Sequence, residues 1–364
     1  MGEMRRVVVH DYFEAPEGGG KLACILARET GADLACGFKF APHPYFKELF
    51  RGPVRQIGCR VPVPLFRQLM LVAAFLRRSA FLFDYDTAVF SGSYAPLGVL
   101  KGGARQNIYY CHTPPRFLYD RRHHFRRSLP RYLRPFFALF VRWYKTRYEA
   151  ALAQMDSVAT NSQNVRRRIL RYLGRDAVVI YPPCDTQRFR HLGQDDFFLS
   201  AARLDPLKRV DRVVSAFSRV PEKRLVVVSG GPEEGRIRQM ASELSNVTFL
   251  GPVSESRLVS LMGTCIAVLY IPEEEDFGMV PVEAMAAGKP VIGVREGGVS
   301  ESVIHGHTGV LLDPNPSIEA VAEAVKAMTA EMARSFRSAC EARAREFDTS
   351  VFIERMRKLI QRIQ

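Results

Sequence analysis

The sequence predicts an α/β fold made of two halves, each built around a parallel β-sheet. Short apolar runs alternate with helical stretches along the 364 residues, which is the pattern of repeated strand–helix–strand units. The pattern breaks once, where Tyr181-Pro182-Pro183 precedes a polar stretch from Gln187 to Asp196 that we interpret as an exposed linker. A chain of this length accommodates two domains, each with its own core.

Each half supplies a series of short apolar segments that we expect to be strands. In the first half they span residues 6–10, 33–37, 87–90, 107–111, 157–160 and 178–180. In the second half they span residues 197–201, 225–229, 247–250, 266–270, 291–294 and 310–312. Helical stretches separate them: one follows Gly20, and residues 131–153 predict a long helix.

The composition is that of a soluble globular protein, with 47% hydrophobic and 25% charged residues. The N-terminus does not have the pattern of a signal peptide, because Glu3, Arg5 and Arg6 precede only three valines. The longest apolar stretches fall far short of the ~20 residues that a transmembrane helix needs. The seven cysteines are scattered without a Cys-x-x-Cys pair, so we expect neither disulfides nor a zinc site, and a reducing cytoplasmic compartment.

Charge is distributed unevenly along the chain. Residues 1–190 hold 31 Lys and Arg against 14 Asp and Glu, a net charge of +17. The remainder holds 21 against 24, a net charge of −3. This asymmetry predicts an anionic partner for the N-terminal half.

The most informative segment runs from Pro272 to Leu312. It opens with an acidic loop and continues as a short apolar helix that Gly288 ends. Glu275 lies in the loop and Glu283 lies inside the helix, where a carboxylate is costly to bury without a partner. Sugar hydroxyls are suitable partners, because one ionised carboxylate accepts hydrogen bonds from two neighbouring hydroxyls.

The backbone N–H groups of Phe277, Gly278 and Met279 start the same helix, where a diphosphate can rest against the helix dipole. With its Phe-Gly, Glu-Ala-Met-Ala-x-Gly and Pro-Val elements, the segment resembles retaining glycosyltransferases of family 4 (group 1), whose signature is two glutamates separated by seven residues. The resemblance implies that Glu275 holds the sugar hydroxyls and Glu283 the ribose. An acidic loop with a helix-capping glutamate is the simpler alternative.

The resemblance extends over nearly the whole chain and is most specific over residues 197–313. It implies two Rossmann-like domains facing a cleft, the GT-B architecture, with the active site between them. We expect an acceptor-binding domain at 1–190 and a nucleotide-sugar-binding domain at 191–346. A basic, amphipathic helix at 347–364 would cross back to the first domain.

Two further elements of the second half are similar to donor-binding elements of the family. An Arg-Leu-(three residues)-Lys element that binds the donor diphosphate corresponds to Arg203 and Lys208, and both side chains suit phosphate oxygens. A solvated basic loop is the alternative. Arg209 stands where the family usually has glycine. Val253 falls in the loop that would contact the nucleobase.

A run of three glycines, Gly18-Gly19-Gly20, lies between the first expected strand and the first helix. Glycines there let the backbone approach a phosphate and tolerate positive φ. In the family a Gly-Gly loop at this point faces the donor phosphates, which assigns Gly19 and Gly20 to donor binding. Lys21 replaces the family's glutamate, and it either adds to diphosphate neutralisation or points into solvent.

His112 comes at the carboxyl end of an expected strand, where ligands bind in α/β sheets. A similar His-Thr-Pro-x-Arg-Tyr/Phe element occurs in bacterial polysaccharide transferases, many of them mannosyltransferases. It implies that His112 contacts the donor sugar near the reacting centre, and a structural histidine is the alternative. We place His10, Asp11 and Arg116 on the acceptor side.

The tripeptide Asp84-Tyr85-Asp86 has the spacing of a metal-binding motif of a different transferase fold. It directly precedes an expected strand, and a surface turn explains it as well. We therefore assign no metal site and expect no cofactor, with the nucleotide sugar as a substrate.

A basic and aromatic region spans Arg116 to Tyr148. Its cations are Arg121, Arg122, Arg126, Arg127, Arg131, Arg134, Arg142, Lys145 and Arg147, interleaved with Phe125, Tyr132, Phe136, Phe137, Phe140, Trp143 and Tyr144. Cations and aromatic rings suit an anionic membrane surface, and the region could equally dock a lipid-linked acceptor. The alternative is a solvated helix whose aromatic side chains face the core. We find no nucleic-acid-binding motif.

The resemblance implies a retaining hexosyltransferase that moves mannose from GDP-mannose onto a lipid-linked or other glycan acceptor, in bacterial surface polysaccharide or glycolipid synthesis. It would be cytoplasmic and peripheral on the inner face of the plasma membrane. The alternatives are a UDP-sugar donor (UDP-glucose or UDP-N-acetylglucosamine), an epimerase or glycogen-type synthase of the same fold, and a non-catalytic basic protein that binds anions.

Overall fold

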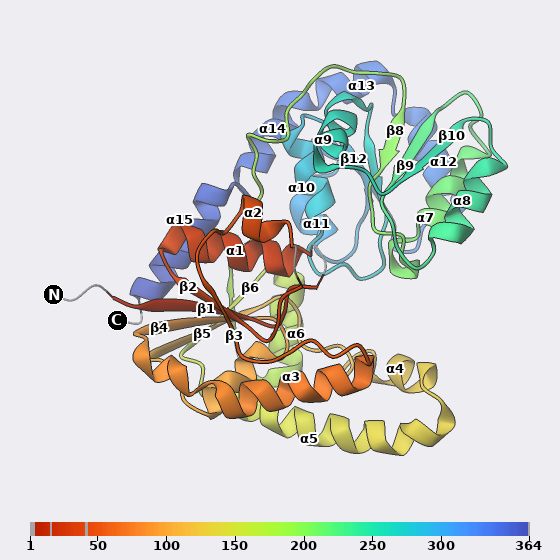
Figure 1. The fold of residues 1–364 in the computed structure, drawn as a ribbon. Coiled ribbons are helices and arrows are strands. Elements are labelled where there is room, and N and C mark those ends of the chain that lie inside the picture. Colours follow the sequence, from red (N-terminus) through yellow and green to blue (C-terminus); the bar gives the residue numbers. More distant parts are fainter. Residues whose placement is uncertain (1–3, 15–16, 41–42, 363–364) are drawn as a thin grey trace. The chain divides into compact units, whose positions relative to one another are not determined.

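The computed structural model describes residues 4–14, 17–40 and 43–362, which divide into two compact units (Figure 1). Unit 1 comprises Met1–Tyr181 and Ile353–Gln364, and unit 2 comprises Pro182–Phe352. Each unit contains one parallel sheet with helices packed on it, which confirms the predicted α/β fold.

The first boundary lies at Tyr181, ahead of the expected position at residue 190, because the stretch that we interpreted as an exposed linker is tied to unit 2. The Leu192 amide donates to the carbonyl of Gly263 at 2.9 Å. Glycine permits this close approach, since a Cβ at Gly263 would lie 2.6 Å from the carbonyl oxygen of Arg190.

The sheet of unit 1 has seven parallel strands in the order β3-β2-β1-β4-β5-β6-β7. The strands are β1 Arg6–His10, β2 Asp33–Cys36, β3 Val54–Gln56, β4 Thr87–Ser91, β5 Gln106–Cys111, β6 Ser157–Thr160 and β7 Val178–Val179. In the register of the central strands, Val8 lies opposite both Leu34 and Val89. The sequence analysis missed β3, a short edge strand that is mostly exposed and therefore has no apolar run.

The helices of unit 1 cover both faces of its sheet. They are α1 Gly18–Thr30, α2 Tyr45–Glu48, α3 Pro64–Arg78, α4 Arg122–Ser128, α5 Arg134–Ala153 and α6 Gln163–Leu173, with 3-10 turns η1 Ala80–Asp84, η2 Ala95–Leu100 and η3 Arg131–Leu133. Figure 1 shows α1 over one face of the sheet and α3 and α5 over the other. The helix predicted at 131–153 is confirmed as η3 followed by α5.

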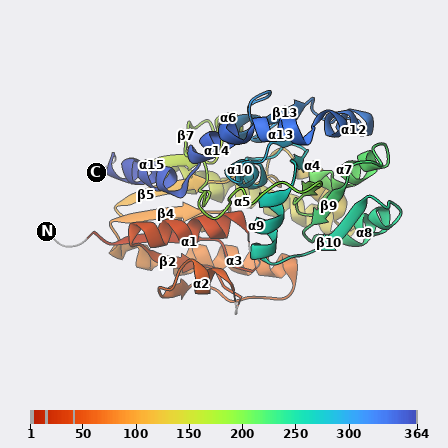
Figure 2. The same cartoon turned by 90° about the horizontal axis from the view of Figure 1, so that it is seen from above.

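The sheet of unit 2 has six parallel strands in the order β10-β9-β8-β11-β12-β13. The strands are β8 Phe198–Ser200, β9 Leu225–Val228, β10 Val247–Gly251, β11 Val268–Tyr270, β12 Val291–Val294 and β13 Gly309–Leu312. The helices are η4 Pro206–Lys208, α7 Val210–Phe217, α8 Glu234–Ser242, α9 Glu255–Thr264, α10 Met279–Ala286, α11 Val299–Ser302, α12 Ile318–Ala327, α13 Ala330–Ser335 and α14 Arg337–Arg345. Helix α7 packs on α8 and α12, whereas α10 packs on α9, α11 and α14. Figure 2 shows α8 beside the edge strand β10.

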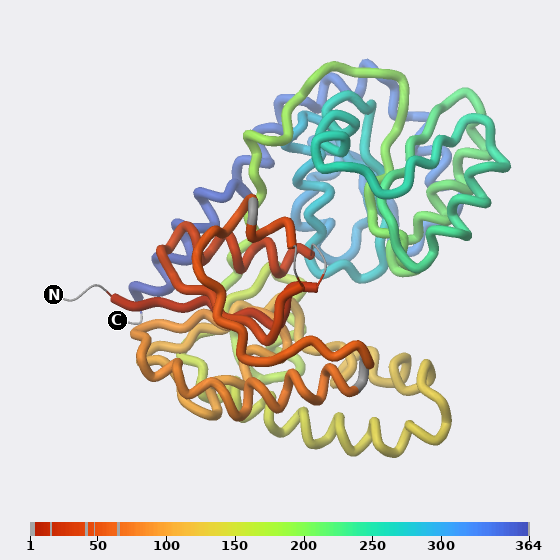
Figure 3. Tube along the Cα trace, in the orientation of Figure 1, coloured from red at the N-terminus to blue at the C-terminus, as the bar shows by residue number. Residues whose placement is uncertain are grey.

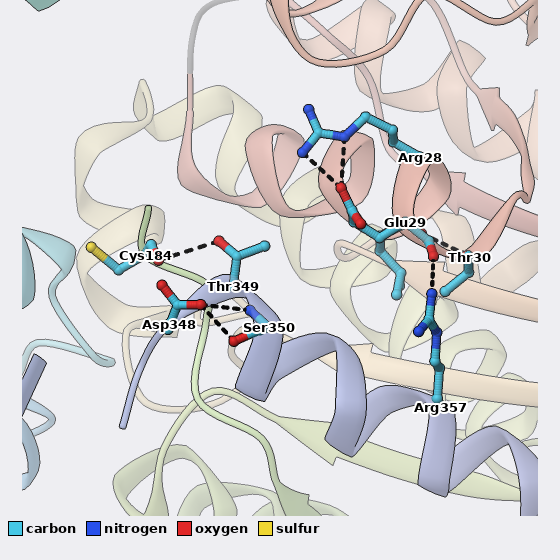
Figure 4. Close-up of polar contacts among 9 residues, drawn as sticks. Arg28, Glu29, Thr30, Cys184, Asp348, Thr349, Ser350 and Arg357 are labelled. Carbon is cyan, nitrogen blue, oxygen red and sulfur yellow. Dashed lines mark hydrogen bonds and ion pairs between the residues drawn. The ribbon is translucent and has the colours of Figure 1, made fainter. Parts of the chain in front are cut away.

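The last helix, α15 Thr349–Gln361, begins in unit 2 and ends in unit 1. Its start is stabilised by Asp348, whose Oδ1 accepts a hydrogen bond from the Ser350 amide at 2.9 Å (Figure 4). Within unit 1, Arg357 donates to the carbonyl of Glu29 at 2.6 Å, at the end of α1. The blue C-terminal segment in Figure 3 runs beside this part of the chain.

None of the described helices is long and apolar enough to cross a membrane. All seven cysteines lie within the described residues and outside disulfides, and six of them are buried.

Candidate active site

In each sheet the first strands along the chain extend the sheet toward one edge, and the later strands extend it toward the other edge. The strand order therefore reverses at one point. In unit 2 this point lies between β8 and β11, and in unit 1 it lies between β1 and β4. Ligands of open α/β sheets bind outside the carboxyl ends of the strands at such a point, because the loops on its two sides diverge. The polar residues singled out in the sequence gather at these two places.

In unit 2 the loop after β8 lies against the loop after β11. The Glu273 amide donates to the carbonyl of Leu207 at 2.7 Å, which joins the two loops. This contact brings Lys208 next to Glu275: the Lys208 ammonium group donates to Glu275 Oε2. The Tyr270 hydroxyl, at the end of β11, donates to the same carboxylate oxygen at 2.7 Å.

These three groups form the Lys208–Glu275–Tyr270 cluster. The side chains of Lys208 and Glu275 are 24% and 15% exposed, so their charges are largely withdrawn from water and favour each other strongly. Burial, together with the negative charge of Glu275, raises the pKa of Tyr270 well above 10, so its hydroxyl keeps its proton and remains a donor. The cluster offers an ammonium group to anions and a carboxylate to hydroxyls.

Glycines hold the acidic loop in place. Gly278 precedes α10 with a φ of 83°, and a Cβ there would lie 2.9 Å from the Tyr270 ring. Gly298 donates its amide to the Glu275 carbonyl at 2.9 Å, and a Cβ on it would lie 2.2 Å from the Cα of Phe277. The second loop, at 296–298, therefore supports the first. The sequence analysis did not include it in the site.

The predicted Phe277–Met279 amides lie at the N-terminus of α10, where helical N–H groups lack intrahelical acceptors. Phe277 itself is buried and packs against Phe347 with ring centroids 5.6 Å apart. Glu283 is half-buried on α10. Helix α10 thus carries the Glu283 carboxylate, and the backbone amides of Phe277–Met279 lie at its N-terminus.

The loops after β8, β9 and β10 are joined to one another. Leu204 donates its amide to the Gly230 carbonyl at 3.0 Å, and Ser229 donates its amide to the Gly251 carbonyl at 2.8 Å. Arg203, which is exposed, and Val253, which is half-buried, therefore lie at the same edge of the sheet as Lys208.

Arg209 departs from the family pattern in its side chain but not in its backbone. Its φ of 51° and ψ of 36° are in the left-handed region that glycine adopts most easily. The side chain is buried and its guanidinium group lies 3.5 Å from the carboxylate of Glu273. This ion pair adds a second connection between the two loops that hold Lys208 and Glu275.

In unit 1 two histidines and a serine meet where β1, β4 and β5 end. The Ser91 Oγ lies 3.2 Å from His10 Nδ1 and 2.9 Å from His112 Nε2. Burial lowers the pKa of His10 from 6.5 to about 3 and that of His112 from 6.5 to about 4, so both rings are neutral near pH 7.

The expectation of a glycine loop at Gly18–Gly20 was wrong, because these residues form the first turn of α1 without positive φ. Gly19 nevertheless permits a close approach. A Cβ on Gly19 would lie 3.3 Å from His112 Nε2 and 3.5 Å from His10 Cε1, so the helix begins directly beside both rings. Gly20 packs instead against the ring of Phe13.

Asp11 has a structural role that the sequence did not reveal. Its carboxylate accepts hydrogen bonds from the amides of Ser93, Tyr94 and Ala95 at 2.6–2.8 Å. Burial raises its pKa to about 6, while these hydrogen bonds act in the opposite direction. Its carboxylate therefore holds the loop after β4.

Two nitrogens of Arg116 contact one oxygen of Asp120, Oδ2: Nε lies 2.9 Å from it and one terminal nitrogen lies 2.7 Å from it. Its guanidinium group is thus engaged within its own loop. Asp86 accepts the Arg5 amide at 2.9 Å and pairs with Arg105. Among the described residues no group of three or more His, Cys, Asp or Glu side chains is arranged to hold a metal.

Comparison with known families identifies both units. Residues 35–188 match the family described as Glycosyltransferase Family 4, and residues 185–347 match Glycosyl transferases group 1. The chain belongs to glycosyltransferase family 4.

The relatives of this transferase include alpha-1,3/1,6-mannosyltransferases ALG2. The Mus musculus protein is 28% identical over 270 residues, which cover 64% of this chain and 62% of the relative. The Dictyostelium discoideum protein is 26% identical over 336 residues, which cover 75% of this chain and 76% of the relative. The chain thus matches less than two thirds of the mouse protein's length.

The crystal structure of Anabaena Alr3699/HepE in complex with UDP-glucose superimposes with a TM-score of 0.76 at 20% identity. The match covers 98% of this chain and 99% of that one. At this identity the likeness establishes the GT-B fold alone.

The sequence analysis missed Ser91 and Tyr270. Both are the last residue of a strand, at the carboxyl ends where this transferase gathers its polar groups. The last residue of a strand indicates a site residue only when that strand lies beside the point where the strand order reverses. The sequence does not give the strand order.

The first prediction concerns the loop at 296–298. Gly298→Ala should place a methyl group against the backbone of Phe277, lowering the free energy of unfolding by about 1–3 kcal/mol and displacing Glu275. Gly235→Ala is the matched control, because nothing lies near a Cβ there and the residue is helical, so stability should stay equal or rise by up to about 1 kcal/mol. Thermal denaturation of both variants measures this, and equal melting temperatures would contradict the packing argument.

The second prediction concerns pH. The unfolded chain protonates His10 and His112 near pH 6.5, whereas the folded chain does so only near pH 3 and 4. The stability contributed by keeping them neutral is complete above pH 6.5 and falls as the pH drops, by up to about 1.4 kcal/mol per pH unit for each ring. Urea denaturation between pH 7.5 and 5 should show a shallower decline for His112→Gln than for the unchanged protein. Identical pH dependence of the two proteins would refute the assignment.

Proposed function

We propose that this transferase moves a hexose, mannose from GDP-mannose, onto a lipid-linked or other glycan acceptor with retention of anomeric configuration. The observation that carries the proposal is the Lys208–Glu275–Tyr270 cluster beside the N-terminus of α10, at the carboxyl ends of β8 and β11. The choice of mannose is supported by the names of the two ALG2 relatives and by the His112 segment.

In the proposed reaction the nucleoside diphosphate leaves the sugar and gains negative charge. Lys208, Arg203 and the amides at the start of α10 would stabilise this charge. These fixed cations and dipoles supply the compensation that a metal ion provides elsewhere, so we propose that no metal is required.

The carboxylate of Glu275 would accept hydrogen bonds from hydroxyls of the sugar, and Glu283 would accept them from the ribose. Tyr270 and Lys208 hold the Glu275 carboxylate in place, because both donate hydrogen bonds to its Oε2. We propose that the acceptor hydroxyl attacks from the face that the diphosphate leaves. A glycosyl-enzyme adduct trapped and detected by mass spectrometry would contradict this.

A UDP-sugar is the second candidate donor, because the HepE structure, which shares the fold, holds UDP-glucose. The test measures calorimetric binding and product formation with GDP-mannose, UDP-glucose and UDP-N-acetylglucosamine, using Glu275→Ala as the inactive reference. Turnover of GDP-mannose alone supports the proposal. Turnover of a UDP-sugar contradicts the choice of GDP-mannose as the donor. Conversion without an acceptor indicates an epimerase, and binding of none of them indicates a non-catalytic protein.

The third prediction concerns the diphosphate. Lys208→Ala should weaken GDP binding by about 1.5–3 kcal/mol, roughly 10- to 100-fold, because one charge-assisted contact is lost. Lys326→Ala, an exposed lysine on α12, should leave the affinity unchanged. Calorimetric titration decides the matter, and equal affinity of the two variants would mean that the phosphates bind elsewhere.

We further propose that the basic N-terminal half binds an anionic membrane surface at the cytoplasmic face, where a lipid-linked acceptor would be available. The aromatic and apolar side chains of helix α5 lie on two faces. Tyr144 and Tyr148 are fully buried in the core, whereas Phe136 and Leu139 are 70% and 69% exposed. The exposed face is the one that could contact lipid.

This exposed face borders an apolar groove of about 530 Å³ between α3 and α5. The groove is lined by Leu69, Leu129, Leu133, Phe136, Phe137, Leu139, Phe140 and Trp143. The cations Arg122, Arg126, Arg127 and Arg131 are exposed on α4 and η3, next to it in the chain. Apolar side chains beside cations suit an anionic bilayer, where each cation contributes about 1 kcal/mol.

The fourth prediction concerns this face. The double variant Phe136→Ser, Leu139→Ser should lower binding to vesicles containing phosphatidylglycerol by about tenfold or more, because buried apolar area is lost. Leu170→Ser, at a leucine on α6 that is 56% exposed, should bind like the unchanged protein. Sedimentation with vesicles measures the binding, and binding of the double variant at the level of the unchanged protein would refute the assignment.

A further inference from the structure

The Ser91 hydroxyl lies between two imidazole rings in the interior of unit 1. Its oxygen is 3.2 Å from His10 Nδ1 and 2.9 Å from His112 Nε2. Ser91 is fully buried and His10 is 8% exposed, whereas His112 is half-buried. The carbonyl of His112 accepts the Asn161 side-chain amide at 2.9 Å, which holds the backbone of His112.

The chemistry of a hydroxyl group couples the two rings. A hydroxyl has one proton, so it donates to one ring nitrogen and accepts an N–H from the other. Each neutral imidazole carries one N–H. Two arrangements satisfy both contacts. In the first, His10 Nδ1–H donates to Ser91, and Ser91 donates to His112 Nε2. In the second, His112 Nε2–H donates to Ser91, and Ser91 donates to His10 Nδ1.

The neighbouring helix distinguishes the two arrangements. A Cβ on Gly19 would lie 3.3 Å from His112 Nε2, so this nitrogen faces the first turn of the 13-residue helix α1. The N-terminal turn of a helix carries a partial positive charge. Such a charge favours a lone pair on the nearest nitrogen over an N–H group, which selects the first arrangement.

We propose that Ser91, supported by His10, is a positioning residue that holds His112 in the tautomer with its proton on Nδ1. The structure gives His112 Nδ1 no hydrogen bond to a described residue, so this N–H is a donor for a substrate oxygen. The use of that donor rests on the proposed transfer function, whereas the tautomer is a property of the protein alone.

The experiment observes the tautomer directly. In protein labelled with ¹⁵N-histidine, the ring nitrogens that carry a proton differ in chemical shift from those that do not, and His112→Gln identifies the signals of His112. The unchanged protein should show His112 protonated on Nδ1, and Ser91→Ala should shift it toward the Nε2–H form that free histidine prefers. Ser91→Thr, which keeps the hydroxyl, should restore the Nδ1–H form.

Ser79→Ala is the matched control, because Ser79 is also a buried serine of unit 1 with a hydroxyl that hydrogen-bonds within the fold, to Phe75. It should change stability without changing the tautomer of His112. An Nε2–H form in the unchanged protein would overturn the proposal, even if Ser91→Ala failed to fold. An unchanged tautomer in folded Ser91→Ala would overturn it as well.

Steady-state rates separate this inference from the proposed function. With a donor that the protein turns over, Ser91→Ala should lower kcat by about tenfold or more, and Ser91→Thr should recover most of it. Normal kcat in a Ser91→Ala protein whose tautomer has changed would show that the Nδ1–H is not used. Lack of turnover with every donor would refute the proposed function and leave the tautomer measurement intact.

Discussion

The half-buried carboxylate of Glu275 is the constraint on which the site of unit 2 depends. A charge withdrawn from water needs partners, and Lys208 and Tyr270 supply them from the loop after β8 and from the end of β11. To bring these groups together, the two loops are joined through Glu273 and Leu207. A side chain would not fit at Gly278 or Gly298, because the Tyr270 ring and the backbone of Phe277 occupy the space.

The two units have similar sheet topologies but place different kinds of polar group at the point where the strand order reverses. Unit 2 places full charges at its point of strand reversal, where the Lys208 ammonium group can attract anions and the Glu275 carboxylate can accept hydrogen bonds from hydroxyls. Unit 1 places two histidines there and keeps them neutral by burial, next to the start of α1. A neutral imidazole has one N–H donor and one acceptor nitrogen. The neighbouring groups determine which of the two nitrogens carries the proton. Ser91 is the neighbour in contact with both rings.

Helix α5 shows how one amphipathic sequence serves a core and a surface. Tyr109 and Tyr148 join their hydroxyls at 3.1 Å inside the unit, and the Tyr144 hydroxyl donates to the Ser93 carbonyl at 2.6 Å. These aromatic side chains are polar at one end and can be buried because that end is hydrogen-bonded. Phe136 has no such polar end and lies exposed in the apolar groove, a difference that composition does not reveal.

The sequence by itself determined the α/β class, nearly all strands and the position of Glu275 in a loop before a short helix, because these depend on local apolar patterning and on turn residues. It could not determine which groups share a hydrogen bond across 80 residues or more. The carboxylate of Asp11 is used by the loop after β4, 83 residues away at Tyr94. Ser91 contacts His10 in β1, which lies 81 residues away, as well as the nearer His112 directly after β5. The first turn of α1 likewise replaced an expected glycine loop. Only the order of strands in the sheet decides such contacts, because it sets which carboxyl ends lie side by side.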